Sequence, residues 1–316
     1  EIISYGTSGA VFTLLVFSDY PELVFFFLLF LSIYGVTVWE DLGMIALIQV
    51  SSELHTPMYF FLSHLSFVDF CYSTISTPKM IANILKEDKI ISFQECTVQF
   101  YLFCTFGVTE VILLAVMAYD CCVAICDPPL YMVTMSRNLC VELVTCGYLN
   151  ATVCSVIHLC LALQIPSYRS NVINHFFCDL PPLLSLACSD VTVNQLVLYI
   201  VAIFSEIITS VIILISYLFV LITILRMHSA EGRCKAFSTC ASHLAAIAVL
   251  QETILSWDSK SQIRGWQKGE MVDSVLEVEE QSRRGYLGVS LFDSFIPDSM
   301  DMSLSKLQET GKDKEA

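Results

Sequence analysis

The sequence predicts an all-α membrane protein, a bundle of six helices followed by a polar tail. Hydrophobic residues make up 55% of the chain and charged residues 15%, and the mean hydropathy is +0.68. The apolar residues form blocks, and about 20 mostly apolar residues suffice to cross a bilayer. Six blocks are long enough: Leu23–Ile48, Pro57–Leu85, Thr97–Ile125, Leu139–Leu163, Val191–Leu225 and Ala236–Trp257.

The first block predicts a retained helix. It follows about twenty residues of mixed composition that have neither a basic start nor a small-residue cleavage pattern, so we do not expect a signal peptide. Unusually, Glu40 and Asp41 lie deep within it. A charge at the bilayer centre costs at least about 2.5–3.5 kcal/mol unless it faces a polar interior. We therefore expect these two carboxylates to need such a setting.

The chain divides into three parts by composition. Residues 1–22 are the expected extracellular N-terminal segment, and residues 23–257 form the helix bundle. Residues 258–316 are polar, Ser-rich and charged, and their apolar runs are too short to span a membrane. A composition of this kind indicates a flexible or partly helical tail.

The orientation of the bundle is predicted from the few basic residues. Those that flank the fourth and fifth blocks would share one side of the membrane: Arg137, Arg226, Arg233 and Lys235. The positive-inside rule makes that side cytoplasmic and puts the N-terminus outside. Lys86 and Lys89 fall on the opposite side.

Charge and motifs also exclude some functions. The net charge is −15, and no basic stripe of the kind that binds nucleic acid is present. No motif supports an enzyme. Cys234, Cys240 and His243 have a spacing that faintly suggests a metal site, but packing is the better interpretation of a single match among helical residues.

Several sequence motifs resemble the olfactory receptors, a branch of the rhodopsin-like G-protein-coupled receptors. Residues 117–126 (MAYDCCVAIC) resemble that family's MAYDRYVAIC, and residues 54–63 (LHTPMYFFLS) match its LHTPMYFFLS at the start of the second helix. Residues 171–178 (NVINHFFC) resemble its second extracellular loop, and residues 235–244 (KAFSTCASHL) its sixth-helix opening. The resemblance covers most of residues 19–250 and implies a rhodopsin-like bundle with six of seven helices retained.

The chain departs from the family pattern in three places. Cys121 and Cys122 replace the Arg-Tyr pair that follows the Asp, and Glu40-Asp41 replaces Gly-Asn in the first helix. Near Leu250 the resemblance stops, where the family continues with a third extracellular loop and a seventh helix. These departures predict impaired signalling.

Asp69 and Glu110 are carboxylates in the middle of the second and third blocks. Ionisable groups inside a membrane indicate a functional site, because burying them unpaired is costly. In the family, the matching pair faces the bundle interior and is associated with a sodium ion or a proton. The alternative is that both are protonated, hydrogen-bonded core residues.

Three of the fourteen cysteines have expected roles that rest on the resemblance. Cys96, before the third helix, and Cys178, in the extracellular loop, match the family's disulfide bridge, and an extracellular location permits oxidation. The family partner of Cys188 would stand where Tyr168 is found, so we expect Cys188 to be a free thiol.

The resemblance also implies a pocket for a small volatile organic ligand between the third, fifth and sixth helices. Such pockets are mostly apolar with a few polar anchors. Helical spacing puts four residues of the third helix on one face. With two from the fifth helix, the candidate ligand-binding residues are Cys104, Gly107, Val108, Val111, Val201 and Ser205. The alternative is ordinary helix–helix packing, where small residues are common.

The G-protein-facing site should include Asp120 and Cys121. In the family the Arg after the Asp is a main contact for the G protein, and Cys offers neither its fixed charge nor its five donors. Without that Arg, we expect Asp120 to be a solvated carboxylate near the lipid headgroups.

The function that follows is an olfactory receptor of the plasma membrane that binds an odorant and couples, with impaired efficiency, to a stimulatory heterotrimeric G protein in a lipid bilayer. One alternative is a non-signalling product of the same ancestry retained in the endoplasmic reticulum. Another is a transporter or proton pathway, suggested by carboxylates in or beside the blocks: Glu40, Asp41, Asp69, Glu110, Glu142 and Glu206.

Overall fold

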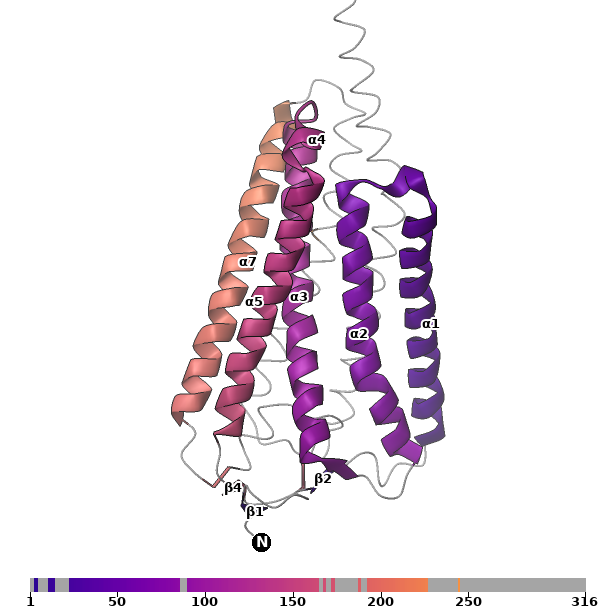
Figure 1. Ribbon diagram of the computed structural model, residues 1–316, viewed down its shortest axis with the longest axis vertical. Helices are drawn as coiled ribbons and strands as arrows, with labels where there is room; N and C mark the ends of the chain where they lie inside the picture. The colour runs from indigo at the N-terminus through magenta and orange to yellow at the C-terminus, as the bar shows by residue number, and fades with distance from the viewer. Residues whose placement is uncertain are drawn as a thin grey trace, which may run out of the picture.

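The computed structural model describes residues 3–4, 11–14, 23–85, 90–164, 167–168, 172–173, 187–188, 192–226 and 244. Five long helices run side by side within this part of the chain (Figure 1). They are α1 (Leu23–Val50), α2 (Pro57–Leu85), α3 (Phe93–Cys126), α5 (Arg137–Leu163) and α7 (Thr192–Arg226). The first five predicted helices are therefore confirmed. The predicted sixth, Ala236–Trp257, lies outside the described residues except for Leu244, and so does the tail from residue 258.

The long helices pack around α3, which is central. Helix α1 packs on α2, α2 on α3, and α3 on both α5 and α7. By length and apolar composition, four of the described helices could cross a membrane: α1 (Leu31–Val50), α3, α5 and α7 (Ile200–Arg226). Helix α2 is of similar length but carries His64, Asp69 and Lys79, which lower its hydropathy.

Two helices begin earlier than predicted, because polar caps precede their apolar runs. Helix α3 starts at Phe93 instead of Thr97, with Ser92 and Glu95 forming a capping box. The Glu95 amide donates to the Ser92 hydroxyl at 3.2 Å, and the Ser92 amide donates to the Glu95 carboxylate at 3.2 Å. Helix α5 starts at Arg137 instead of Leu139, after Ser136 as N-cap. Such caps satisfy amides that have no partner within the helix.

The N-terminal segment contributes strands that the sequence did not predict. Strand β2 (Val11–Leu14) pairs antiparallel with β3 (Ile90–Ser92) and parallel with β5 (Val172–Ile173), while β1 (Ile3–Ser4) pairs antiparallel with β4 (Ser167–Tyr168). These strands gather at the end of the bundle opposite the short helix α4 (Tyr131–Thr134) (Figure 1). The first residues are thus joined to the start of α3 and to the segment after α5.

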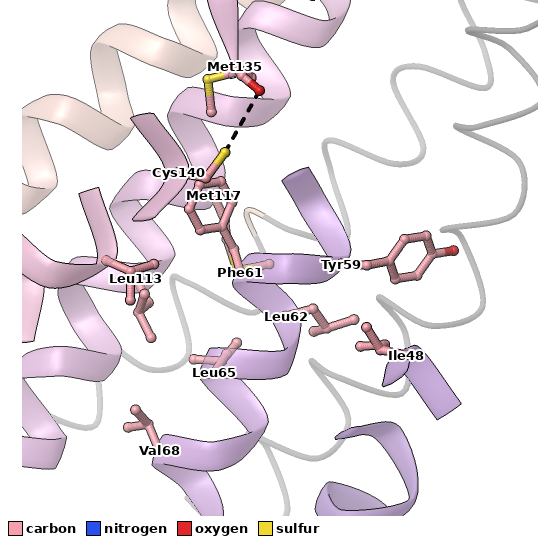
Figure 2. Close-up of a cluster of buried hydrophobic side chains, with 11 residues drawn as sticks. Ile48, Tyr59, Phe61, Leu62, Leu65, Val68, Leu113, Met117, Met135 and Cys140 are labelled. Carbon is pink, nitrogen blue, oxygen red and sulfur yellow. Dashed lines mark hydrogen bonds between the residues drawn. The ribbon is translucent and has the colours of Figure 1, made fainter. Parts of the chain in front are cut away.

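Two hydrophobic clusters hold the bundle together. Figure 2 shows the first, in which α2 contributes Phe61, Leu62, Leu65 and Val68 toward side chains of α1, α3 and α5. Near it the 3-10 helix η1 (Ser52–Leu54) connects α1 to α2. The second cluster joins α3 to α7 and consists of Ala115, Ala118, Ile125, Ile213, Tyr217, Val220 and Ile224. We call it the α3–α7 cluster.

The remaining faces of the helices are apolar and exposed. On α7, Phe204 is 65% exposed and Leu214 is 67% exposed. Helices that are hydrophobic on all sides are buried in large cores or span membranes. These outward side chains accordingly indicate a bundle surrounded by lipid.

Candidate ligand pocket and signalling site

Asp120 is buried near the end of α3, so the expectation of a solvated carboxylate was wrong. Its exposed fraction is 2%. The hydroxyl of Tyr131 in α4 donates to the two carboxylate oxygens at 3.1 and 3.3 Å. Burial, together with the neighbouring Asp120 carboxyl, raises the pKa of Tyr131 above its usual value. The Tyr131 hydroxyl therefore keeps its proton and remains a donor to Asp120. This hydroxyl takes the place of solvent as the partner of the Asp120 carboxylate.

The Asp120–Tyr131 hydrogen bonds can be tested by replacing Tyr131 with Phe. The change leaves a buried carboxylate short of a donor, and hydrogen bonds to charged groups contribute about 1.5–3 kcal/mol. We expect a clear drop in the thermal midpoint of the purified protein in detergent. The control is Tyr119→Phe, one residue from Asp120 but 39% exposed. Equal midpoints for the two variants would contradict a stabilising role for Tyr131.

Cys121 lies beside Asp120 and is partly buried. Its side chain packs against the α3–α7 cluster together with Leu114 and Cys122. A thiol in this position adds apolar packing between α3 and α7. It presents no fixed positive charge and no fork of donors to a partner protein.

Three carboxyl groups from three helices share the interior of the bundle. Asp41 of α1 interacts electrostatically with Asp69 of α2 and with Glu110 of α3, and Asp69 interacts with Glu110. Asp41 is 6% exposed, and its Oδ2 atom has no hydrogen-bond partner within the described residues. The neighbouring Glu40 is exposed. The predicted pair Asp69 and Glu110 is thus accompanied by a third carboxyl group.

The oxygen atoms of this group bear on its fit to a sodium ion. Oxygen ligands are the kind that hard cations prefer, and the buried Oδ2 of Asp41 is such a ligand without a partner in the described chain. However, no set of three or more His, Cys, Asp or Glu side chains among the described residues is arranged to hold a metal ion.

Apart from Gly107, the candidate pocket residues of α3 continue the side of this helix that meets α7. On α3, Cys104, Val108 and Val111 lie four and three residues apart, and the same spacing continues to Ala115 and Ala118 of the α3–α7 cluster. Residues three and four apart share one helix face. The predicted stripe is therefore the extension of a contact surface that the structure does contain.

The candidate residues of α7 are spaced differently from those of α3. Val201, Ser205, Thr209, Ile213 and Tyr217 are each four residues apart, and the last two belong to the α3–α7 cluster. The hydroxyl of Ser205 donates to the carbonyl of Ala202 at 2.8 Å, which leaves its oxygen able to accept. Each step of four residues turns about 40° around a helix, so Ser205 lies nearer than Val201 to the side of α7 that carries Ile213.

Gly107 differs from the other candidate residues. A Cβ atom built on it would lie 3.6 Å from Cε2 of Tyr72 in α2. Tyr72 in turn stacks on Phe103, with ring centroids 4.7 Å apart. Gly107 therefore lies against α2, at the edge of the predicted stripe, and the packing alternative fits it better.

Cys96 and Cys188 have the states that were expected for them. Cys96 is disulfide-bonded and 4% exposed, whereas Cys188 is a free cysteine. Cys178 lies outside the described residues, so the pairing of Cys96 with Cys178 stays a prediction.

Alkylation of the mature protein tests this bridge. We expect Cys96 and Cys178 to resist an alkylating reagent until a reductant is added, because a disulfide has no free thiol to react. Cys188 should react without reductant. Mass spectrometry of the labelled peptides gives each site separately, and labelling of Cys96 before reduction in surface-delivered protein would overturn the assignment.

Sequence reasoning missed Tyr131 as a partner of Asp120. The only available signal was its position eleven residues after Asp120, beyond the turn at Pro128 and Pro129. Neither residue type nor spacing identifies a hydrogen bond across such a turn.

These features together define a helical membrane protein with a rhodopsin-like bundle. The crystal structure of squid rhodopsin superposes with a TM-score of 0.63 at 16% identity, covering 94% of this chain and 91% of that one. At this identity the likeness establishes the fold.

The family follows from sequence comparison. The olfactory receptor family model matches residues 30–257. Human olfactory receptor 5L1 is 70% identical over 251 residues, which cover 79% of this chain and 81% of the relative. Human olfactory receptor 5D18 is 58% identical over 251 residues, covering 79% and 80%, and the dog olfactory receptor-like protein OLF1 is 48% identical over 245 residues, covering 77% and 79%. The chain belongs to the olfactory receptor family.

Proposed function

We propose that this protein binds a small volatile organic molecule between α3 and α7, and that it couples only weakly to a stimulatory G protein. The observation that supports the pocket most strongly is the continuous side of α3 described above. One half of it, near Asp120, is closed by the α3–α7 cluster, whose residues are at most 8% exposed. In the other half, the candidate residues are only partly buried.

This partly buried half contains the candidate pocket. The corresponding residues of the α3–α7 cluster are fully buried. The candidate residues are only partly buried, and they are Cys104, Val108, Val111, Val201 and Ser205. A ligand needs a space bordered by apolar side chains with a few polar anchors. The Ser205 oxygen and the Cys104 thiol are the polar anchors of this space, and the valines are its apolar walls.

A ligand can shift the bundle only by its difference in affinity for two arrangements. In the proposed mechanism the ligand separates α3 from α7 at the candidate pocket residues. This separation changes the packing of the α3–α7 cluster, next to Asp120 and Cys121. The absence of a guanidinium at Cys121 then weakens the contact with the G protein. Protonation of the group formed by Asp69, Glu110 and Asp41 would accompany the shift.

The non-signalling alternative has a specific observation in its favour, namely Cys121 packed within the bundle. It predicts ligand binding without a cellular response, or retention in the endoplasmic reticulum in place of delivery to the plasma membrane. A transporter or proton pathway is less well supported. Of the carboxylates that suggested it, Glu40 and Glu142 are on exposed helix faces, away from the group formed by Asp41, Asp69 and Glu110.

Ligand-dependent thermal stabilisation tests the pocket without relying on signalling. A ligand at about 100 times its Kd stabilises the folded protein by roughly 2.7 kcal/mol. We expect at least one compound from a panel of volatile odorants to raise the thermal midpoint of the purified protein, and Ser205→Phe to abolish the rise by filling the space.

The matched control is Ile207→Phe, which adds a ring on the same helix at a side chain that is 56% exposed. It should keep the response to the ligand. Loss of the response in both variants, or in neither, would contradict a pocket at Ser205.

A further inference from the structure

Two cysteines near the end of α3 form a sulfur pair beside α7. The Sγ atoms of Cys122 and Cys126 are 3.8 Å apart, and Sγ of Cys126 is 3.2 Å from Oγ1 of Thr223 in α7. Neither cysteine is in a disulfide, and Cys126, the last residue of α3, is exposed. We propose that Cys122 and Cys126 bind a thiophilic divalent cation of the zinc class.

The spacing of the two sulfurs suits such an ion. Zn²⁺ binds thiolates at about 2.3 Å in tetrahedral geometry, which puts two sulfurs of one ion roughly 3.8 Å apart. Residues four apart on a helix present their side chains on one face. The pair therefore needs little movement to accept a cation, which reduces the cost of ordering the site.

The hydrogen bonding of Thr223 fixes the direction of its contact with Cys126. The Thr223 hydroxyl donates to the carbonyl of Phe219 at 3.0 Å, so its proton is already used. In the contact between Cys126 and Thr223, the thiol is then the donor and the hydroxyl oxygen the acceptor. When the cation binds, each thiol gives up its proton to solvent and binds as thiolate. Two protons are released, and no electrons are transferred.

The remaining coordination positions belong to water, with the Thr223 oxygen as the nearest additional donor. Adjacent cysteines do not complete the site. Cys121 is one residue from Cys122 and so lies on a different face of α3. Cys140 is buried, and its thiol donates to the carbonyl of Met135 at 3.8 Å. The inference thus concerns a two-sulfur site, open on one side, and it does not depend on the proposed receptor function.

The test uses the full chain, purified in detergent and reduced, with Cd²⁺ and Zn²⁺ as probes. Cd²⁺–thiolate bonds absorb in the ultraviolet, so a titration reports binding to sulfur directly. The variants are Cys122→Ser, Cys126→Ser and the double variant. Cys146→Ser is the control, because Cys146 is an exposed cysteine on α5 away from the pair. Thermal midpoints establish that each variant is folded.

Loss of an outer-shell partner already lowers metal affinity about 10–100-fold, and loss of a sulfur ligand should lower it at least as much. We expect each single Cys→Ser change to remove the tightest Cd²⁺ absorption step, the double variant to lose no more than either single one, and Cys146→Ser to keep it. Zn²⁺ should compete for that step, and its affinity should fall as the pH is lowered. The proposal is overturned if either Cys122→Ser or Cys126→Ser binds Cd²⁺ as the unmodified chain does.

Discussion

Replacing Phe61 with Ala should destabilise the bundle by about 3–5 kcal/mol, the usual cost of truncating a fully buried Phe. Phe61 is 0% exposed and extends from α2 toward Met117 and Cys140 (Figure 2). Its ring also packs edge-on against Phe60, with centroids 5.9 Å apart. In a membrane the loss is chiefly one of packing, since lipid tails are as apolar as the helix interior.

The comparison that isolates this effect is Phe67→Ala. Phe67 is on the same helix and is 45% exposed, so its removal should change the free energy of unfolding by no more than about 0.5 kcal/mol. Equilibrium unfolding of both variants in mixed micelles measures the difference. Similar losses for Phe61 and Phe67 would show that the first hydrophobic cluster does not hold α2 in place.

Restoring the family's Arg at position 121 should rescue signalling only when a family-type seventh helix is also present. A charge-assisted hydrogen bond contributes about 1.5–3 kcal/mol. That energy corresponds to roughly a ten- to hundredfold change in an equilibrium. We nevertheless expect Cys121→Arg alone to give no odorant response, because the resemblance to the family ends near Leu250, before the seventh helix that would complete the bundle interior.

A chimera makes this prediction measurable. Residues 258–316 are replaced by the part of human olfactory receptor 5L1 that follows its matched region, with Cys or Arg at position 121. The chimera with Arg should produce cyclic AMP at odorant concentrations at least about tenfold lower than the chimera with Cys. Equal responses from the two chimeras would show that the residue at position 121 does not limit coupling.

Much of the fold could be predicted from the sequence, because long apolar runs in a membrane protein have few alternatives to helices. The bounds of α2 were predicted to the residue. The bounds of α3 were less accurate, since its first turn is fixed by the polar capping box at Ser92 and Glu95, which precedes the apolar run. Strands of two to four residues, such as β1 and β2, carry too few residues for a detectable pattern.

The site was less predictable, because its decisive contacts join residues that are distant in sequence or belong to different helices. The periodicity of α3 identified the stripe that includes Val108 and Val111, but it could not show that Gly107 lies against Tyr72. Likewise, the sequence marked Asp41 as an unusual carboxylate without indicating that it shares the interior with Asp69. Asp120 seemed to lose its partner with the Arg, yet Tyr131 provides one from α4.

Weak coupling is tested most directly by measuring cyclic AMP in cells that express the unaltered chain, with surface delivery established by an N-terminal tag on intact cells. We expect the odorants of the panel to raise cyclic AMP weakly or not at all, including any compound that stabilises the purified protein. A robust odorant-dependent rise in cyclic AMP from this chain at the plasma membrane would contradict it.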